Sequence, residues 1–405
     1  MIKAIKYRFY PTKDQETLLK KTLGCTRFVY NKCLDIKSSL YKTEKKNISG
    51  FELMKKLTAW KAEEDTKFLK DVSNVALQQT IRHLEVAFEN FFAKRASYPV
   101  FKKRRNGGSF SLTTFGFRVK DKRIYLAKSK YPLNLAEKKW RIKDNDKISS
   151  VSIRLTPSNK WYISVLVKNE EYLSLPKSDK VIGLDMGITS LVTDSDGRKF
   201  NAPDCRKDYT KLKHLQKESS RKQKNSNNRT KANIKIARIY EKISNKREDN
   251  LHKLTTKLVN ENQVIVIEDL AVKNMIKNHK LAKAISDASW RRLRQMLSYK
   301  CQWYDRELKL VDRFYPSSKT CSHCGCILEN LALSQRSWKC PRCGIIHDRD
   351  INAAKNILAA GHVVYVCGGS IRLKDTLVSN AISKETENLS RETGRTTALA
   401  VGECQ

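Results

Sequence analysis

Four cysteines in two pairs constrain the fold of this chain more than any other feature of its sequence. Cys321 and Cys324 form one pair, Cys340 and Cys343 form the other, and fifteen residues separate the pairs. This spacing is typical of a zinc ribbon, in which four thiolates hold one Zn²⁺ tetrahedrally. Four protein ligands leave no open position for water, so we expect a structural Zn²⁺. The alternatives are four cysteines that bind no metal and a four-thiolate iron site, which the spacing also allows.

The other seven cysteines are scattered along the chain, so we expect no disulfide framework and a reducing compartment. Cys326, His323 and His347 are rival ligands near the two pairs. We rank Cys326 lower because it breaks the paired spacing.

A formal net charge of +39, from 81 Lys and Arg against 42 Asp and Glu, points to a polyanionic partner. Nucleic acid fits best, because binding neutralises phosphates and releases their counterions. The alternative is a basic protein whose charge serves only to keep it soluble. No run approaches the roughly 18 apolar residues of a membrane span, and the N-terminus lacks the apolar stretch of a signal peptide. We therefore expect a cytoplasmic protein of a bacterium or archaeon, with no membrane partner.

The periodicity of apolar residues predicts a mixed, multidomain α/β plus β architecture. Residues 2–10 alternate as a half-buried strand, and Thr12 or Asp14 is placed to cap a helix that follows Pro11. Residues 12–95 have helical spacing, whereas strand patterns return after residue 109. The first strand and residues 109–175 could thus form one β domain that the helical segment interrupts.

Later in the chain, residues 181–184 and 264–267 are short buried strands, and residues 191–200 read as a hairpin. Residues 206–257 carry 17 Lys and Arg against 5 Asp and Glu, and are predicted to form two antiparallel helices with basic outer faces. The predicted buried stripe of these helices is Ile236, Ile239, Ile243, Leu251, Leu254 and Leu258. The tail after residue 361 is predicted to be disordered.

Three carboxylates lie at the ends of predicted core elements. Asp185 follows the first buried strand, Glu268 follows the second, and Asp350 precedes a helix at 351–358. A strand end directs its side chain into the crevice at the edge of a sheet. If the three acids converge there, they need a cation, and hard oxygen ligands select Mg²⁺ or Mn²⁺. Two such ions can activate a water and stabilise the leaving oxygen of a phosphodiester.

Each acid also has an ordinary explanation, as a turn residue, a surface acid or a helix cap. Asp269 and Asp348 are the rival acids. We rank Asp269 lower because the residue after Glu268 should point to the other face of the strand. We rank Asp348 lower because it lies farther from the start of the helix.

The motifs around these residues give the chain a family resemblance. GLDMGI contains Asp185, VIEDL contains Glu268, and HDRDINAAKNI contains Asp350. Together with the YPSSKTCSHCG and WKCPRCG knuckles and the segments YRFYP, LGCTRFVYN and ALQQTIRHL, they resemble TnpB, the protein of insertion sequences that is similar to type V CRISPR nucleases. The resemblance runs to about residue 370.

The resemblance implies a RuvC-type, RNase H-like nuclease domain with an inserted zinc ribbon, and a wedge β-barrel interrupted by a helical recognition domain. The implied domains are the wedge (1–10 and 106–179), the recognition domain (11–105), the nuclease domain (180–313 and 346–360, with 206–257 inserted) and the ribbon (314–345). The tail that the lack of periodicity predicts is residues 361–405.

The resemblance also implies a Mg²⁺-dependent DNA endonuclease. A guide RNA from the transposon end would pair with double-stranded target DNA next to a short motif, and we favour a monomer. By motif match, Asp185, Glu268 and Asp350 are the metal-binding catalytic acids. Gln78 matches a family residue that contacts the adjacent DNA motif. A glutamine that simply lies on the surface of a helix explains this position equally well.

Two other functions remain open. A guide-independent transposase would use the same acids without RNA. A zinc-ribbon regulator would bind nucleic acid and cut nothing.

Overall fold

The computed structural model describes residues 2–104, 107–137, 140–143, 146–168, 174–332 and 334–366. The chain divides into two compact units, the first formed by residues 1–171 and 206–242 and the second by residues 172–205 and 243–405. The last helix continues to Val366, past the predicted start of the tail at residue 361. The rest of that tail lies outside the described residues.

The first unit contains a five-stranded antiparallel sheet in the order β2-β6-β7-β1-β5. Its strands are β1 (Ile2–Tyr10), β2 (Gly108–Thr113), β5 (Asn134–Leu135), β6 (Lys147–Leu155) and β7 (Trp161–Lys168). β1 pairs with β7 from Ile2 opposite Lys168 to Phe9 opposite Trp161. The first strand therefore joins strands from beyond residue 108, and its alternating residues Ile5, Tyr7 and Phe9 are buried in their common core.

The helical segment between these strands has its own apolar core. It comprises α1 (Lys13–Glu44), α2 (Gly50–Ala62), the 3₁₀ helix η1 (Glu64–Asp71) and α3 (Asn74–Phe92). Thr12 caps α1 in a capping box with Gln15, which settles the choice between Thr12 and Asp14. A short 3₁₀ turn, η3 (Thr114–Gly116), then leads into the hairpin of β3 (Phe117–Lys120) and β4 (Arg123–Leu126).

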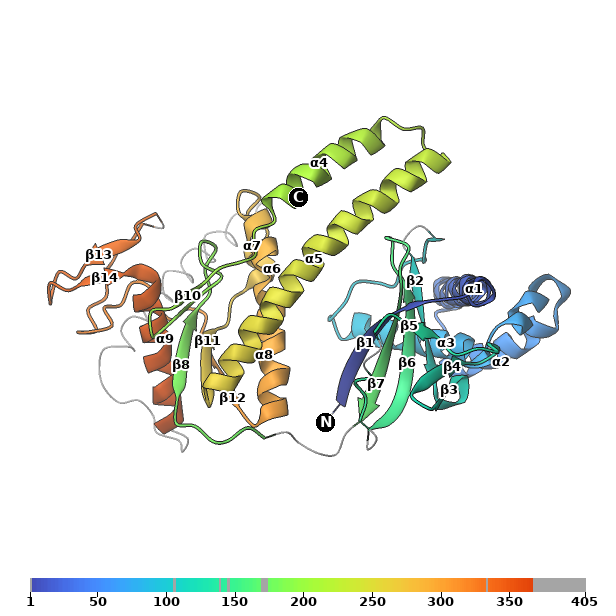
Figure 1. Cartoon of the computed structure of the whole chain (residues 1–405), viewed down its shortest axis with the longest axis horizontal. Coiled ribbons are helices and arrows are strands. Elements are labelled where there is room, and N and C mark those ends of the chain that lie inside the picture. Colours follow the sequence, from blue (N-terminus) through green and yellow to red (C-terminus); the bar gives the residue numbers. More distant parts are fainter. Residues whose placement is uncertain are drawn as a thin grey trace, which may run out of the picture. The chain divides into compact units, whose positions relative to one another are not determined.

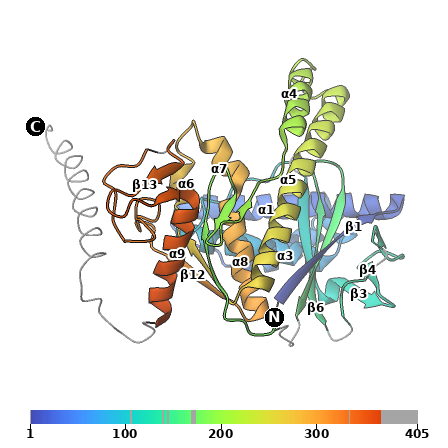
Figure 2. The same cartoon turned by 60° about the vertical axis from the view of Figure 1, so that its left-hand side comes forward.

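The basic segment forms α4 (Arg206–Ser220) and α5 (Asn227–Glu261), which lie side by side in Figures 1 and 2. Asp208 contacts Lys242 and Ser219 contacts Asn233, so the two helices are antiparallel, as predicted. The predicted stripe is buried from Ile243 to Leu258. Ile236 and Ile239 are only partly buried, and for these two positions the prediction was too strong.

The second unit is built on a mixed sheet in the order β10-β9-β8-β11-β12. Its strands are β8 (Val181–Asp185), β9 (Val192–Asp194), β10 (Lys199–Phe200), β11 (Val264–Glu268) and β12 (Glu307–Val311). β8, β11 and β12 are parallel, and β9 and β10 form the predicted hairpin. This confirms both strands predicted at 181–184 and 264–267.

Helices cover both faces of this sheet (Figure 1). One face packs against α5, α7 (Ala282–Ala288) and α8 (Trp290–Tyr304), and α6 (Val272–Met275) follows β11. The other face packs against α9 (Arg349–Val366). The two-stranded ribbon sheet, β13 (Ser337–Lys339) and β14 (Ile346–Asp348), leads directly into α9. Among the helices of the described residues, none has the length and apolarity to span a membrane.

Candidate active site and metal centre

Two of the three predicted acids end neighbouring parallel strands. Asp185 is the last residue of β8, and Glu268 is the last residue of β11. Ile267 lies opposite Leu184, so both acids leave the sheet at the same level. Side chains alternate along a strand, and Val266 packs toward α9. Glu268, two residues later, therefore points to the α9 side of the sheet.

Helix α9 brings the third acid to this face. Asp350 lies in the first turn of α9. The helix approaches β8 closely because Gly183 has no side chain, and a Cβ there would overlap the backbone of Ala354. Gly361 allows a second close approach, where a Cβ would overlap the side chain of Val266. These two glycines hold the helix that carries Asp350 tightly against the sheet.

The three carboxylates act on one another electrostatically. Burial, followed by the negative charges of Glu268 and Asp350, raises the pKa of Asp185 from 3.8 to about 8. Burial also raises the pKa of Glu268 above its usual value, against the effect of a hydrogen bond from Ser317. Carboxylates that are buried together in this way favour a bound cation.

Two side chains that the sequence did not single out contact these acids. The Ser317 hydroxyl donates a hydrogen bond to Glu268 Oε1. Arg336 Nη1 lies 3.4 Å from Asp350 Oδ1, and its Nη2 donates to Thr189 Oγ1 at 3.2 Å. Arg336 thus supplies a positive charge at the rim of the acid cluster. Local sequence carries no signal for these contacts, because most of them join residues far apart in the chain.

The rival acids have structural partners instead. Asp269 forms ion pairs with Arg294 of α8 and with Arg313, which hold its pKa below the usual value despite the opposing effect of burial. It therefore faces the opposite side of the sheet, as the alternation predicted. Asp348 Oδ1 accepts the backbone N–H groups of Asp350 and Ile351, at 3.0 and 3.1 Å, and so caps α9.

The donor set of the three acids suits Mg²⁺ or Mn²⁺, since all its ligand atoms are carboxylate oxygens. Their oxygens are not all within 4.8 Å of one another: among the described residues, only the four cysteines meet that criterion. In this arrangement the three acids therefore do not close around a single ion as the four cysteines do.

The four predicted cysteines do come together. Cys321, Cys324, Cys340 and Cys343 place their sulfur atoms within 4.8 Å of one another. Each pair forms a knuckle in which the following glycine has a positive φ, +70° at Gly325 and +74° at Gly344. The backbone N–H of Cys343 lowers the Cys340 pKa to about 6. Against a backbone hydrogen bond that lowers it, burial and hydrogen bonds to the neighbouring thiols raise the Cys343 pKa to about 12, so the first thiolate forms at Cys340. The cluster therefore has the composition and closed geometry of a structural zinc site.

The ribbon is fastened to α9 by two buried asparagines. Asn352 Nδ2 donates to the carbonyl of Thr320 at 2.7 Å and its Oδ1 accepts from the Ser322 N–H at 2.9 Å. Asn356, one turn later, donates to the carbonyl oxygens of Ser317 and Thr320. The first cysteine knuckle, Ser317 and the helix that carries Asp350 are thus one connected assembly.

The remaining predicted residues stand as follows. His347 is buried, and its Nε2 lies 3.0 Å from Cys321 Sγ, beside the cysteine cluster. Cys326 packs against the cluster but is not one of its four members. Gln78 lies partly buried on α3, and its contact with DNA stays a prediction.

Comparison with known proteins decides the family. Three family models match the chain. The helix-turn-helix domain of the OrfB IS605 type matches residues 1–46, and the OrfB IS605 model, described as "Probable transposase", matches residues 164–279. A Cas12f1-like TNB domain matches residues 290–357. A Streptomyces pristinaespiralis protein named "Putative RNA-guided DNA endonuclease" is 45% identical, over 91% of this chain and 92% of its own length. The chain belongs to the TnpB/OrfB family.

Two further comparisons agree with this family assignment. The Escherichia coli K12 protein named "Putative RNA-guided DNA endonuclease InsQ" is 34% identical over 92% of this chain and 95% of its own length. Among solved structures, Cas12f1 in complex with sgRNA and target DNA matches with a TM-score of 0.55 at 12% identity, covering 88% of this chain and 98% of that chain. The fold of the TnpB/OrfB chain is thus similar to that of Cas12f1, and the resemblance inferred from the motifs is confirmed.

Proposed function

We propose that this protein is an RNA-guided DNA endonuclease whose active site is formed by Asp185, Glu268 and Asp350. The observation that carries the proposal is the placement of these acids, from β8, β11 and α9, on one face of the mixed sheet, where the charges of Glu268 and Asp350 act on Asp185. The names of the two curated relatives support the same activity.

In this proposal the second unit's sheet with α9 is the RuvC-type, RNase H-like nuclease domain, and the cysteine cluster holds its structural Zn²⁺. The antiparallel sheet of the first unit is the wedge domain, and the helices α1 to α3 inserted in it are the recognition domain. The strand pairing of β1 with β7 supports this division, since it places the helical segment inside one β domain.

Asp185, Glu268 and Asp350 would hold Mg²⁺ or Mn²⁺. When bound, the ions supply a nucleophilic water at neutral pH and stabilise charge on the phosphodiester oxygens. Asp185 must release the proton that its raised pKa retains near neutral pH before it can bind a cation. Ser317 orients Glu268 through its hydrogen bond, and the Asn356 bond to the Ser317 carbonyl fixes that serine. Asp348 fixes the first turn of α9, on which Asp350 lies.

The partners in this proposal are a guide RNA from the transposon end and double-stranded target DNA. The net charge of +39 supports a long phosphate contact. Exposed cations follow α4 and the first half of α5, among them Lys211, Lys213, Lys217, Lys231, Lys235 and Arg238. Base pairing with the guide would read the DNA sequence, while the protein reads backbone shape and a short adjacent motif, for which Gln78 is the candidate.

The test is to purify the protein from its host, sequence the RNA that co-purifies, and assay cutting of a matching DNA duplex in Mg²⁺. We expect RNA from the transposon end and cutting that ribonuclease treatment of the complex abolishes. The description "Probable transposase" favours a second candidate, strand transfer by the same acids. Strand joining by RNA-free protein would establish that function instead.

A further inference from the structure

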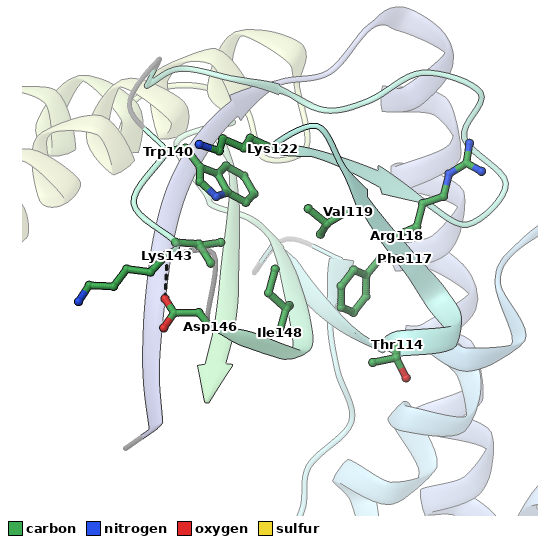
Figure 3. Close-up of a pocket in the computed structure, with 10 residues that line it drawn as sticks. Thr114, Phe117, Arg118, Val119, Lys122, Trp140, Lys143, Asp146 and Ile148 are labelled. Atoms are coloured by element: carbon green, nitrogen blue, oxygen red, sulfur yellow. Dashed lines mark hydrogen bonds between the residues drawn. The ribbon is translucent and has the colours of Figure 1, made fainter. Parts of the chain in front are cut away.

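A hollow of about 430 Å³ lies in the β domain of the first unit, on residues that the proposed active site does not use. Its volume is within the range of roughly 300–1,000 Å³ that is usual for ligand pockets. Phe117, Val119, Trp140 and Ile148 face one another across it (Figure 3). The hollow is therefore mainly apolar and aromatic, on a chain whose surface is strongly basic.

The indole of Trp140 is held in place from behind. It stacks on Tyr7 with ring centroids 6.1 Å apart and an interplanar angle of 13°. The backbone N–H of Arg141 donates to the Tyr7 hydroxyl at 2.8 Å, which fixes the residue next to Trp140. Tyr7 is fully buried and does not line the hollow. Trp140 therefore contacts Tyr7 with one part of its ring surface and lines the hollow with another. An aromatic ring fixed in this way binds a planar ligand without losing further conformational freedom.

Lys122 is placed beside this ring by a strained turn. Lys120 pairs with Arg123, so Asp121 and Lys122 form a two-residue hairpin loop, with φ values of +50° and +56°. Such a loop prefers glycine at its second position, because the left-handed conformation is unfavourable for other residues. Glycine at position 122 would fit this turn with less backbone strain. Lys122 instead extends its cation toward Trp140 (Figure 3).

The charges around the hollow favour an anionic ligand with a flat apolar part. Lys122 and Lys143 are exposed at its edge. Lys122 and Trp140 also line a neighbouring hollow of about 550 Å³, which in addition contains Arg123 and the acids Asp121 and Glu137. The acid of the first hollow is Asp146, whose Oδ2 accepts the backbone N–H of Lys143 at 2.9 Å. Arg118 points away from the ring cluster in Figure 3.

We propose that this hollow binds one unpaired nucleobase of an RNA, stacked on Trp140, with Lys122 against the adjoining phosphate. The proposal rests on the proposed function, in which the protein binds a folded RNA. RNA is the favoured source because a folded RNA presents unstacked bases in its loops and bulges before any target is bound, whereas the target DNA keeps its bases paired and stacked until the guide opens the duplex. Stacking on an aromatic ring combined with a nearby cation is how proteins hold single-stranded bases.

The test is ultraviolet crosslinking of the full-length protein to a single-stranded polyuridine RNA, followed by mass spectrometry of the crosslinked peptides. Polyuridine serves as the probe because its bases stack weakly on one another. We expect a crosslink on the peptide that contains Trp140 or Phe117. Lys122→Gly should reduce its yield several-fold, yet it suits the left-handed turn and so should not unfold the hairpin. Lys120→Ala removes the same charge two residues away, does not line the hollow, and should leave the yield unchanged.

Trp140→Leu should weaken binding of the same RNA by about tenfold, within the range known for loss of base stacking. RNA that binds but crosslinks only elsewhere would overturn the proposal, as would equal crosslinking of a paired RNA duplex. Equal yields from the matching single-stranded DNA would overturn the assignment to RNA. Cutting activity is a separate readout. A crosslink at Trp140 without guided cutting would reject the proposed function and leave base binding in the hollow standing. Guided cutting without the crosslink would reject base binding in the hollow and leave the proposed function standing.

Discussion

Glu268 and Asp269 are adjacent in the sequence, yet they face opposite sides of the sheet and their pKa values shift in opposite directions. Alternation along β11 explains the difference, since one side chain meets the acid cluster and the other meets Arg294 and Arg313. This much could be predicted from sequence. The Ser317 and Arg336 contacts could not, because they depend on how the ribbon folds back on the sheet.

Asp185→Asn should stabilise the metal-free protein while abolishing cutting. In the folded chain Asp185 keeps its proton up to about pH 8, whereas in the unfolded chain it loses it near 3.8. The ionised acid therefore costs folding free energy that is absent below about pH 4, grows as pH rises, and is complete above pH 8. The gain at pH 8 should be on the order of a few kcal/mol, because each unit of pKa shift corresponds to about 1.4 kcal/mol.

The measurement compares the free energy of unfolding of Asp185→Asn with that of the unsubstituted protein. Both are obtained by urea denaturation at pH 5 and pH 8.5, in buffer that is stripped of metal and contains no EDTA. A larger gain at the higher pH supports the electrostatic account. A gain that is equal at both pH values, or a loss of stability, contradicts it.

At the scale of whole elements, the contact of α9 with β8 determines whether the acids meet. The sequence predicted both elements but not how closely they pack. A glycine within a strand can mark a bulge, a bend or a close approach of another backbone, and only the position of Ala354 in α9 shows which of these applies to Gly183. The same limit explains the error in α5. Helical spacing predicted one buried stripe, but Ile236 and Ile239 lie where the helix pairs with α4, and they are only partly covered.

Gly183→Ala should separate α9 from the sheet, because the added methyl group overlaps the backbone of Ala354. We expect a loss of about 1–3 kcal/mol in the free energy of unfolding and a drop in Mg²⁺-dependent cutting. Gly24→Ala is the matched control: Gly24 lies in α1, and beyond the backbone of its own helix no atom lies within 4 Å of an added Cβ, so alanine should stabilise the helix by up to about 1 kcal/mol. Equal effects of the two substitutions in thermal unfolding would rule out the close-contact explanation.

The ribbon should depend on zinc, and its loss should reach the acid site. Cys340→Ser removes a member of the cluster, so we expect the bound zinc to fall from one ion per chain toward none in elemental analysis. Cutting should fall too, because Asn352 and Asn356 join the first knuckle to α9. Cys326→Ser, next to the cluster, should keep the metal. Full zinc in Cys340→Ser, or zinc loss in Cys326→Ser alone, would show that the cluster has been assigned wrongly.

At the scale of the whole molecule, the chain combines a net charge of +39 with the acid cluster of its second unit. The net charge of +39 was enough to predict a nucleic-acid partner, and the ordered motifs were enough to predict the family that the comparisons confirm. The sequence does not specify how the basic residues are divided between RNA and DNA, because phosphate contacts carry no sequence signature of their own.

The most direct test of the central claim compares Glu268→Gln with Asp269→Asn in guided cleavage of a DNA duplex. Both substitutions replace a carboxylate by an amide at adjacent positions, but only Glu268 belongs to the acid cluster. We predict that Glu268→Gln lowers the cutting rate on the order of 10³-fold or more while guided DNA binding persists, and that Asp269→Asn keeps most of the activity. Undiminished cutting by Glu268→Gln would contradict the account.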